Sequence, residues 1–335
     1  MIPFSHRRVQ PKSWKQQYAE CITEPAELLD MLQLPKSLLP AVQLASRLFP
    51  LRVTHDYLDC IEPGNPDDPL LHQILPVADE TRVTEGYSSD PVGDAAATVS
   101  PGLIHKYRGR VLLITTPACA IHCRYCFRRE FPYQASSAHT RHLPQALDYI
   151  RRHKDIHEVI LSGGDPLSLA NDQLQQLLID IQAIAHVKTI RLHSRLPIVL
   201  PDRIDAGLLS LLGQLHKNVV LVVHCNHARE ISDKVASALG RLKQAGITLL
   251  NQSVLLRQVN DDVATLQTLS HKLFAAGVLP YYLHQLDRVS GAQHFAVSDP
   301  EALALHQNLQ QQVPGYLLPR LVREIAGTAS KQNLG

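Results

Sequence analysis

The sequence has little of what marks a secreted or membrane protein. Only six of its 335 residues are cysteine, and three of these lie within one stretch of eight residues, so a disulfide framework is not expected. No hydrophobic run approaches the roughly 20 residues that cross a bilayer. The N-terminal residues are partly basic but precede no hydrophobic segment, so no secretory signal is expected. These absences predict a protein of the reducing cytoplasm without membrane contact.

A large excess of either charge is also missing. Lys and Arg number 33 against 31 Asp and Glu, which gives a formal net charge of +2 and no reason to expect nucleic-acid binding. The hydrophobic fraction of 45% is ordinary for a globular protein with a sizeable core. Internal repeats and low-complexity segments are absent as well. The length fits one large α/β domain or two smaller ones.

The first hundred residues predict short helices followed by a linker. Ser13 can cap a helix that begins at Trp14, and a second helix can run from Pro25 to about Leu34. Residues 70–100 predict a solvated linker, marked by the acidic residues Asp79, Glu80, Glu85, Asp90 and Asp94. We therefore predict three parts: a mainly helical N-terminal region with its linker (1–100), an α/β core (101–325) and a short C-terminal tail (326–335).

Short β-rich runs alternate with amphipathic helix candidates after residue 101. The predicted strands are Val111–Thr116, Glu158–Leu161, Thr189–His193, Val219–Val223, Thr248–Leu256 and Tyr281–His284. The predicted helices lie near 141–153, 171–184, 202–215, 229–244 and 262–275. This alternation predicts an α/β fold of parallel strands joined by crossover helices, with functional residues at the carboxyl ends of the strands.

The most informative stretch runs from Cys119 to Cys126 and contains a C-x3-C-x2-C motif. Cys119, Cys123 and Cys126 follow the first predicted strand, on a loop at its carboxyl end. Because a [4Fe–4S] cluster normally takes four thiolates, three would leave one iron open to a small molecule. Two other interpretations stay open: a zinc site with His122 as the fourth ligand, and cysteines that merely pack in the core.

A second motif, Ser162-Gly163-Gly164-Asp165-Pro166, directly follows the second predicted strand. Two successive glycines let backbone groups come close to a ligand. Taken alone, the motif is also compatible with an ordinary turn between a strand and a helix. Its position one strand–helix unit after the cysteines puts both motifs at the same edge of the predicted sheet.

The cysteine motif followed by the Gly-Gly motif is similar to the signature of radical S-adenosylmethionine (SAM) enzymes. Further segments resemble, in the same order, the lysine 2,3-aminomutases, which are radical SAM enzymes that also use pyridoxal phosphate (PLP): residues 101–110, 126–129, 251–256, 280–287 and Lys331. The resemblance spans about residues 60–331 and is strongest to the short branch, the elongation factor P (R)-β-lysylation proteins. It implies a partial (β/α)6 barrel with an N-terminal helical region and a short tail that carries the PLP lysine.

The resemblance implies a site for each cofactor. The three cysteines would hold the [4Fe–4S] cluster. The second motif would hold the methionine amino group of SAM through Ser162, Gly163, Gly164 and Asp165, with His224 nearby. Lys331 would form the Schiff base with PLP, and the other PLP contacts would be Lys106, Tyr107, Arg110 and Gln252. Relatives carry Arg where this chain has Lys106, which lacks the bidentate fork of a guanidinium.

The resemblance also implies catalytic contacts to an amino acid substrate. Arg128 would bind the carboxylate, and Asp287 and Glu324 would face the ε-ammonium group of L-lysine. The implied reaction is a radical 1,2-amino shift that converts L-α-lysine to (R)-β-lysine, so an isomerase is expected. The residues alone leave another possibility, in which Asp287 and Glu324 form surface ion pairs with Arg288 and Arg323.

The family further implies two protein partners. An electron donor such as flavodoxin or ferredoxin would reduce the cluster, and the β-lysine would supply the ligase that modifies elongation factor P. Two other functions stay open on the sequence. One is an aminomutase acting on glutamate or arginine, and the other, from a different class, is a non-catalytic iron–sulfur or zinc-binding protein.

Overall fold

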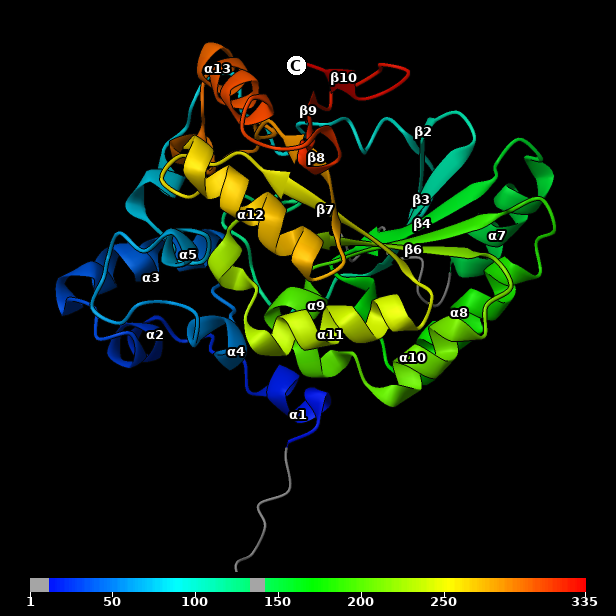
Figure 1. Cartoon of the computed structure of the whole chain (residues 1–335), viewed down its shortest axis with the longest axis horizontal. Helices are drawn as coiled ribbons and strands as arrows, with labels where there is room; N and C mark the ends of the chain where they lie inside the picture. Colours follow the sequence, from blue (N-terminus) through cyan, green and yellow to red (C-terminus); the bar gives the residue numbers. More distant parts are fainter. Residues whose placement is uncertain (1–11, 133–141) are drawn as a thin grey trace, which may run out of the picture.

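The computed structural model describes residues 12–132 and 142–335, and one ten-stranded sheet lies at its centre (Figure 1). Residues 1–11 of the predicted N-terminal region and the start of the predicted helix at 141 lie outside the described residues. The strands lie side by side in sequence order: β1 Thr98–Ser100, β2 Leu103–Tyr107, β3 Arg110–Thr116, β4 Glu158–Gly163, β5 Thr189–Ser194, β6 Asn218–His224, β7 Thr248–Val254, β8 Leu279–His284, β9 Arg320–Arg323 and β10 Gln332–Asn333.

The strands from β3 to β9 run parallel, and they include all six strands predicted from the sequence. Leu113, Leu161 and Leu192 are neighbours across three of these strands and are fully buried, as expected where both faces of a sheet are covered. β1, β2 and β10 add antiparallel pairs at the two ends. Within the described ranges no pairing joins β1 to β10, so the barrel is open and the predicted partial barrel is confirmed.

Helices cover the sheet and leave the carboxyl ends of the strands accessible. In α8 the buried residues recur at helical spacing, at Leu174, Leu177, Leu178 and Ile181, and form the stripe that packs on the sheet. Figure 1 shows α8, α10, α11 and α12 along one side of the sheet. The helices of the core are α7 Leu143–Arg152, α8 Asn171–Gln182, α9 Leu196–Val199, α10 Ala206–Gly213, α11 Asp233–Gln244, α12 Val263–Ala275 and α13 Asp299–Gln310.

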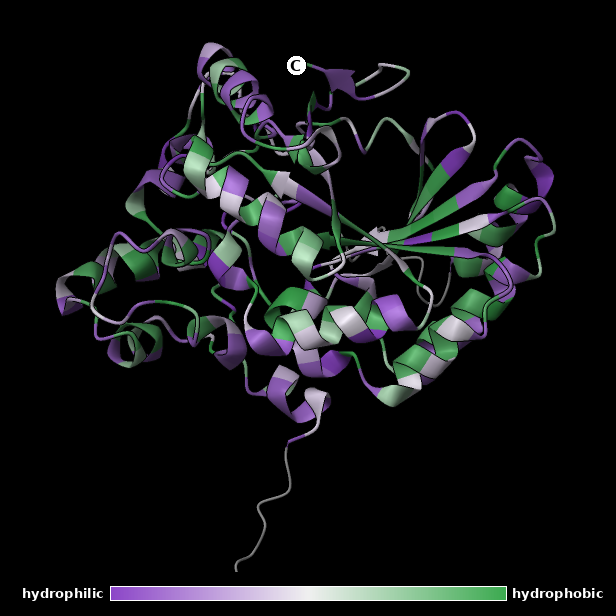
Figure 2. Cartoon of the chain, in the orientation of Figure 1, coloured by the Kyte–Doolittle hydropathy of each residue, from purple (hydrophilic) through white to green (hydrophobic). Residues whose placement is uncertain are grey.

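The five predicted helices of the core are therefore confirmed, with slightly different ends, whereas α9, α13 and β9 were not predicted. The strand β9 is only four residues long and continues an extended run, so its pattern does not reveal that it pairs with β8. Figure 2 shows the central strands coloured largely as hydrophobic, in contrast to the segment that carries β10. None of the described helices is both long and apolar enough to span a membrane.

The N-terminal region packs directly against the barrel. Ser13 and Gln16 form a capping box at the start of α1, as the sequence predicts for Ser13. Buried residues of this region, such as Leu28 and Leu70, belong to the same hydrophobic cluster as Leu113 in β3. Its helices are α1 Trp14–Ala19, α2 Pro25–Met31, α3 Leu39–Leu48, α4 His55–Leu58 and α5 Pro69–His72. The division at residue 100 falls in the turn between β1 and β2 and stays a prediction.

The prediction of a solvated linker at residues 70–100 is wrong for two of its acidic residues. Glu80 and Asp94 are 4% and 2% exposed. Glu80 accepts hydrogen bonds from Arg124 Nε at 2.8 Å and from Arg129 Nη2 at 2.7 Å. Arg124 lies in the loop of residues 119–126, called the cysteine loop below, and Arg129 follows this loop. A buried carboxylate requires such cationic partners, and their positions are visible only in the folded chain.

We expect Glu80→Ala to lower the free energy of unfolding by about 3–5 kcal/mol, because it leaves two buried guanidinium groups without their carboxylate. Urea denaturation with the parent protein measures the change. As a control, Asp148→Ala removes an exposed pair with Arg151 and should cost less than about 1 kcal/mol. Equal losses in the two variants would contradict the structural role of Glu80.

Candidate active site

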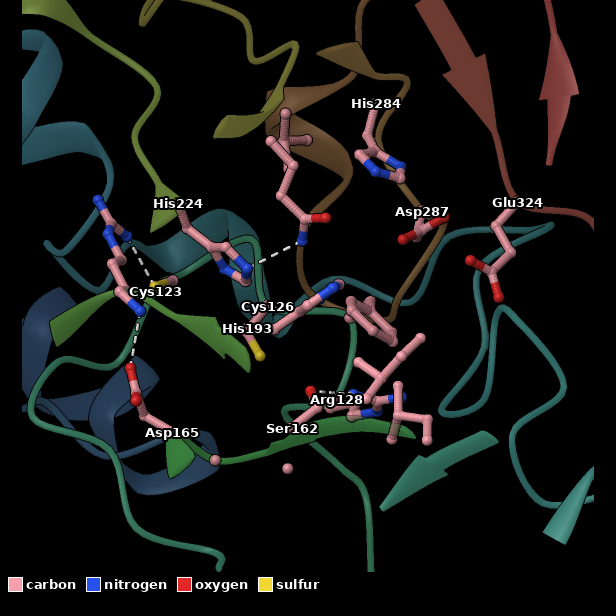
Figure 3. Close-up of a pocket in the computed structure, with 18 of the residues that line it drawn as sticks. Cys123, Cys126, Arg128, Ser162, Asp165, His193, His224, His284, Asp287 and Glu324 are labelled. Carbon is pink, nitrogen blue, oxygen red and sulfur yellow. Dashed lines mark hydrogen bonds between the residues drawn. The ribbon is translucent and has the colours of Figure 1, made fainter. Parts of the chain in front are cut away.

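One cavity of about 400 Å³ opens at the carboxyl ends of the parallel strands and continues into the barrel (Figure 3). All sixteen residues predicted from the sequence line it. From the loops and strands β2 to β4 these are Lys106, Tyr107, Arg110, Cys119, Cys123, Cys126, Arg128, Ser162, Gly163, Gly164 and Asp165; from later elements they are His224, Gln252, Asp287, Glu324 and Lys331. The fold thus brings together chain segments more than 200 residues apart.

The three cysteines lie at one end of the cavity. Burial, with a further contribution from the neighbouring Cys123, raises the pKa of the Cys126 thiol to about 11. Burial also raises the pKa of Cys119, with further contributions from Asp165 and from the other two cysteines. Thiols in this setting become thiolates only beside a compensating positive charge, which bound iron supplies.

The zinc interpretation is not favoured by the geometry. His122 does not line the cavity; its Nδ1 lies 2.8 Å from the carbonyl oxygen of Pro50 and its ring stacks on Phe49. Across residues 12–132 and 142–335, no three Cys, His, Asp or Glu side chains converge closely enough to bind a single metal ion.

The two glycines of the second motif are required by a contact within the protein. A Cβ atom on Gly163 would lie 2.8 Å from the Thr116 carbonyl oxygen, and one on Gly164 would lie 2.4 Å from that of Ala118. The backbone nitrogen of Gly164 donates to the Thr116 carbonyl at 2.7 Å. The motif thereby holds the start of the cysteine loop in place, and the predicted contact of its glycines with a ligand stays a prediction.

Asp165 also supports the neighbouring loops. Its carboxylate accepts hydrogen bonds from Ser194 Oγ at 2.7 Å and from the backbone nitrogens of Arg195, Leu167 and Leu196 at 2.7, 3.0 and 3.1 Å. Burial raises its pKa to about 6, against the effect of these donors. Asp165 therefore joins the ends of β4 and β5, and its predicted contact with SAM stays a prediction.

His224 and Gln252 form a polar pair on the opposite wall. His224 is the last residue of β6, and Gln252 lies in β7. The Nε2 atoms of the two side chains are 2.9 Å apart (Figure 3). Burial lowers the pKa of His224 to about 3, so the imidazole is neutral at physiological pH. A neutral ring can accept the hydrogen bond from the amide of Gln252 and still offer its other nitrogen to a ligand.

The tail closes the other end of the cavity. Gln332 in β10 pairs with Arg323 in β9, and this hairpin brings Lys331 against Glu324 in an ion pair. Glu324 Oε1 also accepts a hydrogen bond from Lys106 Nζ at 2.9 Å. Burial alone would raise the pKa of Glu324, but the two lysines hold it at about 2. Glu324 is therefore a carboxylate shared between two cations.

Arg128 and Asp287 complete the polar lining. Arg128 is 8% exposed, and its Nε donates to Asp94 at 2.7 Å while its Nη1 donates to Ser162 Oγ at 3.1 Å. Asp287 forms no salt bridge within the described part of the chain, and burial raises its pKa to about 7. The alternative of surface ion pairs is wrong for Glu324, since Arg323 binds Asp299 instead.

Sequence reasoning missed several residues of the cavity. His193, one residue before the end of β5, and His284, the last residue of β8, line it, and within the described chain the Nε2 atom of each lacks a hydrogen-bond partner. Both histidines stand at the last positions of predicted strands, and this position could have indicated that they line the site. Arg195 lies beyond the end of β5, and Asp94 comes from the supposed linker, so neither carried a signal in the sequence.

Comparison of the sequence with known proteins shows the family of this chain. Residues 113–269 match the Radical SAM superfamily. The L-lysine 2,3-aminomutase of Escherichia coli (strain K12) is 47% identical over 324 residues, covering 96% of this chain and 94% of the relative. That of Haemophilus influenzae is 44% identical, covering 96% and 95%, and that of Clostridium subterminale is 35% identical, covering 95% and 76%.

The chain belongs to the lysine 2,3-aminomutase family of radical SAM enzymes. It is therefore an isomerase, as the sequence predicts, and its radical SAM domain implies a [4Fe–4S] cluster and SAM. The α/β fold with an open, mainly parallel barrel agrees with this membership. The family assignment leaves the role of each cavity residue to be tested.

The pKa of Asp287 predicts how pH affects the ligand-free aminomutase. Its folded pKa of about 7 lies above the unfolded value of about 3.9, so its stabilising contribution is full below about pH 4 and is lost as pH rises through 7. Replacement by Asn removes this dependence. In urea denaturation, Asp287→Asn should therefore gain stability relative to the parent between pH 5 and pH 8.

Asp299→Asn is the matched control for this prediction. Hydrogen bonds from Arg323 lower the pKa of Asp299, so its contribution is present at neutral pH and is lost as pH falls through its lowered folded pKa. The two variants should thus differ in the sign of their pH dependence. A difference between parent and Asp287→Asn that stays constant from pH 5 to pH 8 would argue against a protonated, buried Asp287.

Proposed function

We propose that this chain is an L-lysine 2,3-aminomutase that converts L-α-lysine to (R)-β-lysine with a [4Fe–4S] cluster, SAM and PLP. The observation that carries the proposal is that the cysteine loop, Lys331 and two carboxylates open into one cavity. The relatives described above bear the name L-lysine 2,3-aminomutase and align with nearly the whole chain. When bound, the cluster and SAM supply a carbon radical that removes hydrogen from an unactivated carbon, and PLP supplies a conjugated ring that delocalises the unpaired electron.

The cluster end of the cavity suits the first two cofactors. In our proposal Cys119, Cys123 and Cys126 bind three irons and leave the fourth to SAM. Neutral His224 and the unpartnered Nε2 of His193 offer hydrogen bonds to a polar ligand without adding charge. Ser162 lies between this end and Arg128, to which it is hydrogen-bonded. These residues hold a ligand between the cluster and the substrate position.

The tail end suits PLP. Lys331 supplies the amine, and the buried hydroxyl of Tyr107 and Nε2 of His284 have no hydrogen-bond partner within the described residues. Arg110 stacks on the Tyr107 ring and forms no ion pair in the described chain, so we assign it the phosphate. Lys106 already contacts Asp94, Glu324 and the Val92 carbonyl, so its main effect is to hold Glu324 in place.

A free lysine substrate fits the remaining charges. Arg128, oriented by Asp94, would bind the carboxylate, and Asp287 would bind the ε-ammonium. Glu324 is already neutralised by two lysines, whereas Asp287 gains its first cationic partner when the substrate enters. An ammonium beside Asp287 favours its ionised form and lowers its raised pKa. The carboxylate of a glutamate side chain would be repelled at the same place.

The biological setting is part of the same proposal. The chain is 47% identical to the Escherichia coli relative and 35% identical to the Clostridium subterminale one, in line with the expected short branch that supplies β-lysine for elongation factor P. We propose a flavodoxin or ferredoxin as electron donor, the ligase of elongation factor P as the user of the product, and a location in the cytoplasm.

Anaerobic assay of the reconstituted protein tests this function directly. Incubation with SAM, PLP, dithionite and lysine should give β-lysine, whereas glutamate or arginine should give little product. Replacing Cys119, Cys123 or Cys126 by Ala should abolish SAM cleavage, since two thiolates hold a cluster poorly. A protein that holds iron but never cleaves SAM would support the non-catalytic alternative.

Lys331 can be tested without turnover. Borohydride reduction of the PLP-loaded protein should fix the cofactor on Lys331, and peptide mapping should find the adduct there. Lys331→Arg should abolish trapping, because a guanidinium cannot form the same bond, while Lys106→Arg should retain it. An adduct on Lys106 in the parent would overturn the assignment of the tail.

Asp287 decides the substrate in our proposal. Asp287→Asn should raise the KM for lysine or abolish turnover, by roughly the 2–5 kcal/mol lost when one side of a buried charged pair is removed. Asp299→Asn, which changes a carboxylate outside the cavity, should leave lysine kinetics unchanged. Unchanged KM in Asp287→Asn, or faster turnover of glutamate than of lysine by the parent, would refute the assignment of lysine.

A further inference from the structure

A buried guanidinium touches the cysteine loop from the side of β5. Arg195 follows β5, is 4% exposed, and its Nη1 atom lies 2.7 Å from Sγ of Cys123 and 2.6 Å from the hydroxyl of Tyr125. Cys123 ends a dashed line in Figure 3, which marks this contact. The cysteine is one of the three that the proposed function assigns to the cluster, and the arginine is not needed for any step described above.

Neighbouring groups hold the Arg195 side chain in one orientation. Its Nη2 atom donates to Glu230 at 2.9 Å and to Gln73 at 2.8 Å, and its backbone nitrogen donates to Asp165 at 2.7 Å. Glu230 is itself 1% exposed and accepts from the backbone nitrogen of Asn226 at 3.0 Å. With Nη2 bound to these acceptors, the side chain is fixed so that Nη1 is the nitrogen that reaches the sulfur of Cys123.

We infer that Arg195 is a positioning residue that sets the reduction potential of the cluster through its hydrogen bond to Cys123. One electron from a low-potential one-electron donor converts the 2+ core of the cluster to the 1+ core, and no bond forms or breaks. The added negative charge spreads onto the sulfur ligands. A hydrogen bond from a cation to one of these sulfurs stabilises the reduced form more than the oxidised form, and therefore raises the potential.

Glu230 acts in the opposite direction in this arrangement. Its carboxylate partly neutralises the guanidinium and lies in the same buried cluster of polar groups. Because few water molecules screen charges in such a place, removing the charge of Glu230 strengthens the positive field at Cys123. Arg195 thus donates a hydrogen bond to the sulfur, while Glu230 reduces the net positive charge beside it.

The test is a redox titration of the reconstituted cluster without SAM, followed by electron paramagnetic resonance of the reduced form. At the potential where the parent is half reduced, Arg195→Gln should lower the ratio of reduced to oxidised cluster about tenfold, which for one electron equals about 59 mV. Arg195→Lys, which keeps the charge but only one donor group, should fall between. Glu230→Gln should shift the ratio toward the reduced form.

The control is Arg124→Lys in the same loop. Arg124 is fully buried, but its guanidinium donates to Glu80 and to the Phe49 carbonyl rather than to a sulfur, and lysine keeps its charge, so this replacement should not move the potential. If Arg195→Gln fails to fold, the potentials of Arg195→Lys and Glu230→Gln, which should shift in opposite directions, still test the inference. Equal potentials in these two variants and the parent, or shifts of the same sign, would overturn the inference.

The experiment also separates this inference from the function on which it rests. Iron and sulfide analysis of the parent comes first. A parent that binds no cluster would contradict the proposed role of Cys119, Cys123 and Cys126 as ligands. A parent that binds a full cluster, with the same reduction potential as the Arg195 variants, would contradict only the inference.

Discussion

Buried charges in this protein are held in ion pairs that join the cysteine loop and the residues after it to distant parts of the chain. Glu80 binds Arg124, Asp94 binds Arg128, and Glu230 binds Arg195, the last of which contacts the loop through Cys123. A buried charge without a partner would cost several kcal/mol, so the elements that carry these partners must dock together. The segment of residues 70–100 is consequently part of the site, because it supplies two of the three carboxylates.

The cavity has chemically different ends because its walls come from different elements. Thiols, a neutral imidazole and the guanidinium of Arg195 line the end near the cysteine loop. Lysines and carboxylates line the end near the tail. The parallel strands keep the two ends at a fixed separation.

Glu324 illustrates how a single residue can serve two partners. It lies between Lys331 and Lys106, so its charge is balanced before any ligand binds. Asp287 lies in the same cavity without a salt-bridge partner in the described chain, and burial raises its pKa. The two carboxylates therefore differ in the proton they carry at neutral pH, although the sequence gives no reason to distinguish them. Their difference is set by the lysines that reach one of them.

The sequence determined the alternating strands and helices, the loop with three cysteines and the gathering of the predicted residues at one edge, because hydrophobic periodicity and motif spacing are local properties of the chain. Only the tertiary structure decided the partners of those residues. Glu80 and Asp94 resembled linker residues, the contacts of the two glycines with Thr116 and Ala118 were not predicted, and Arg195 carried no signal. Burial and ion pairing depend on which distant segments meet, and a local pattern does not contain that information.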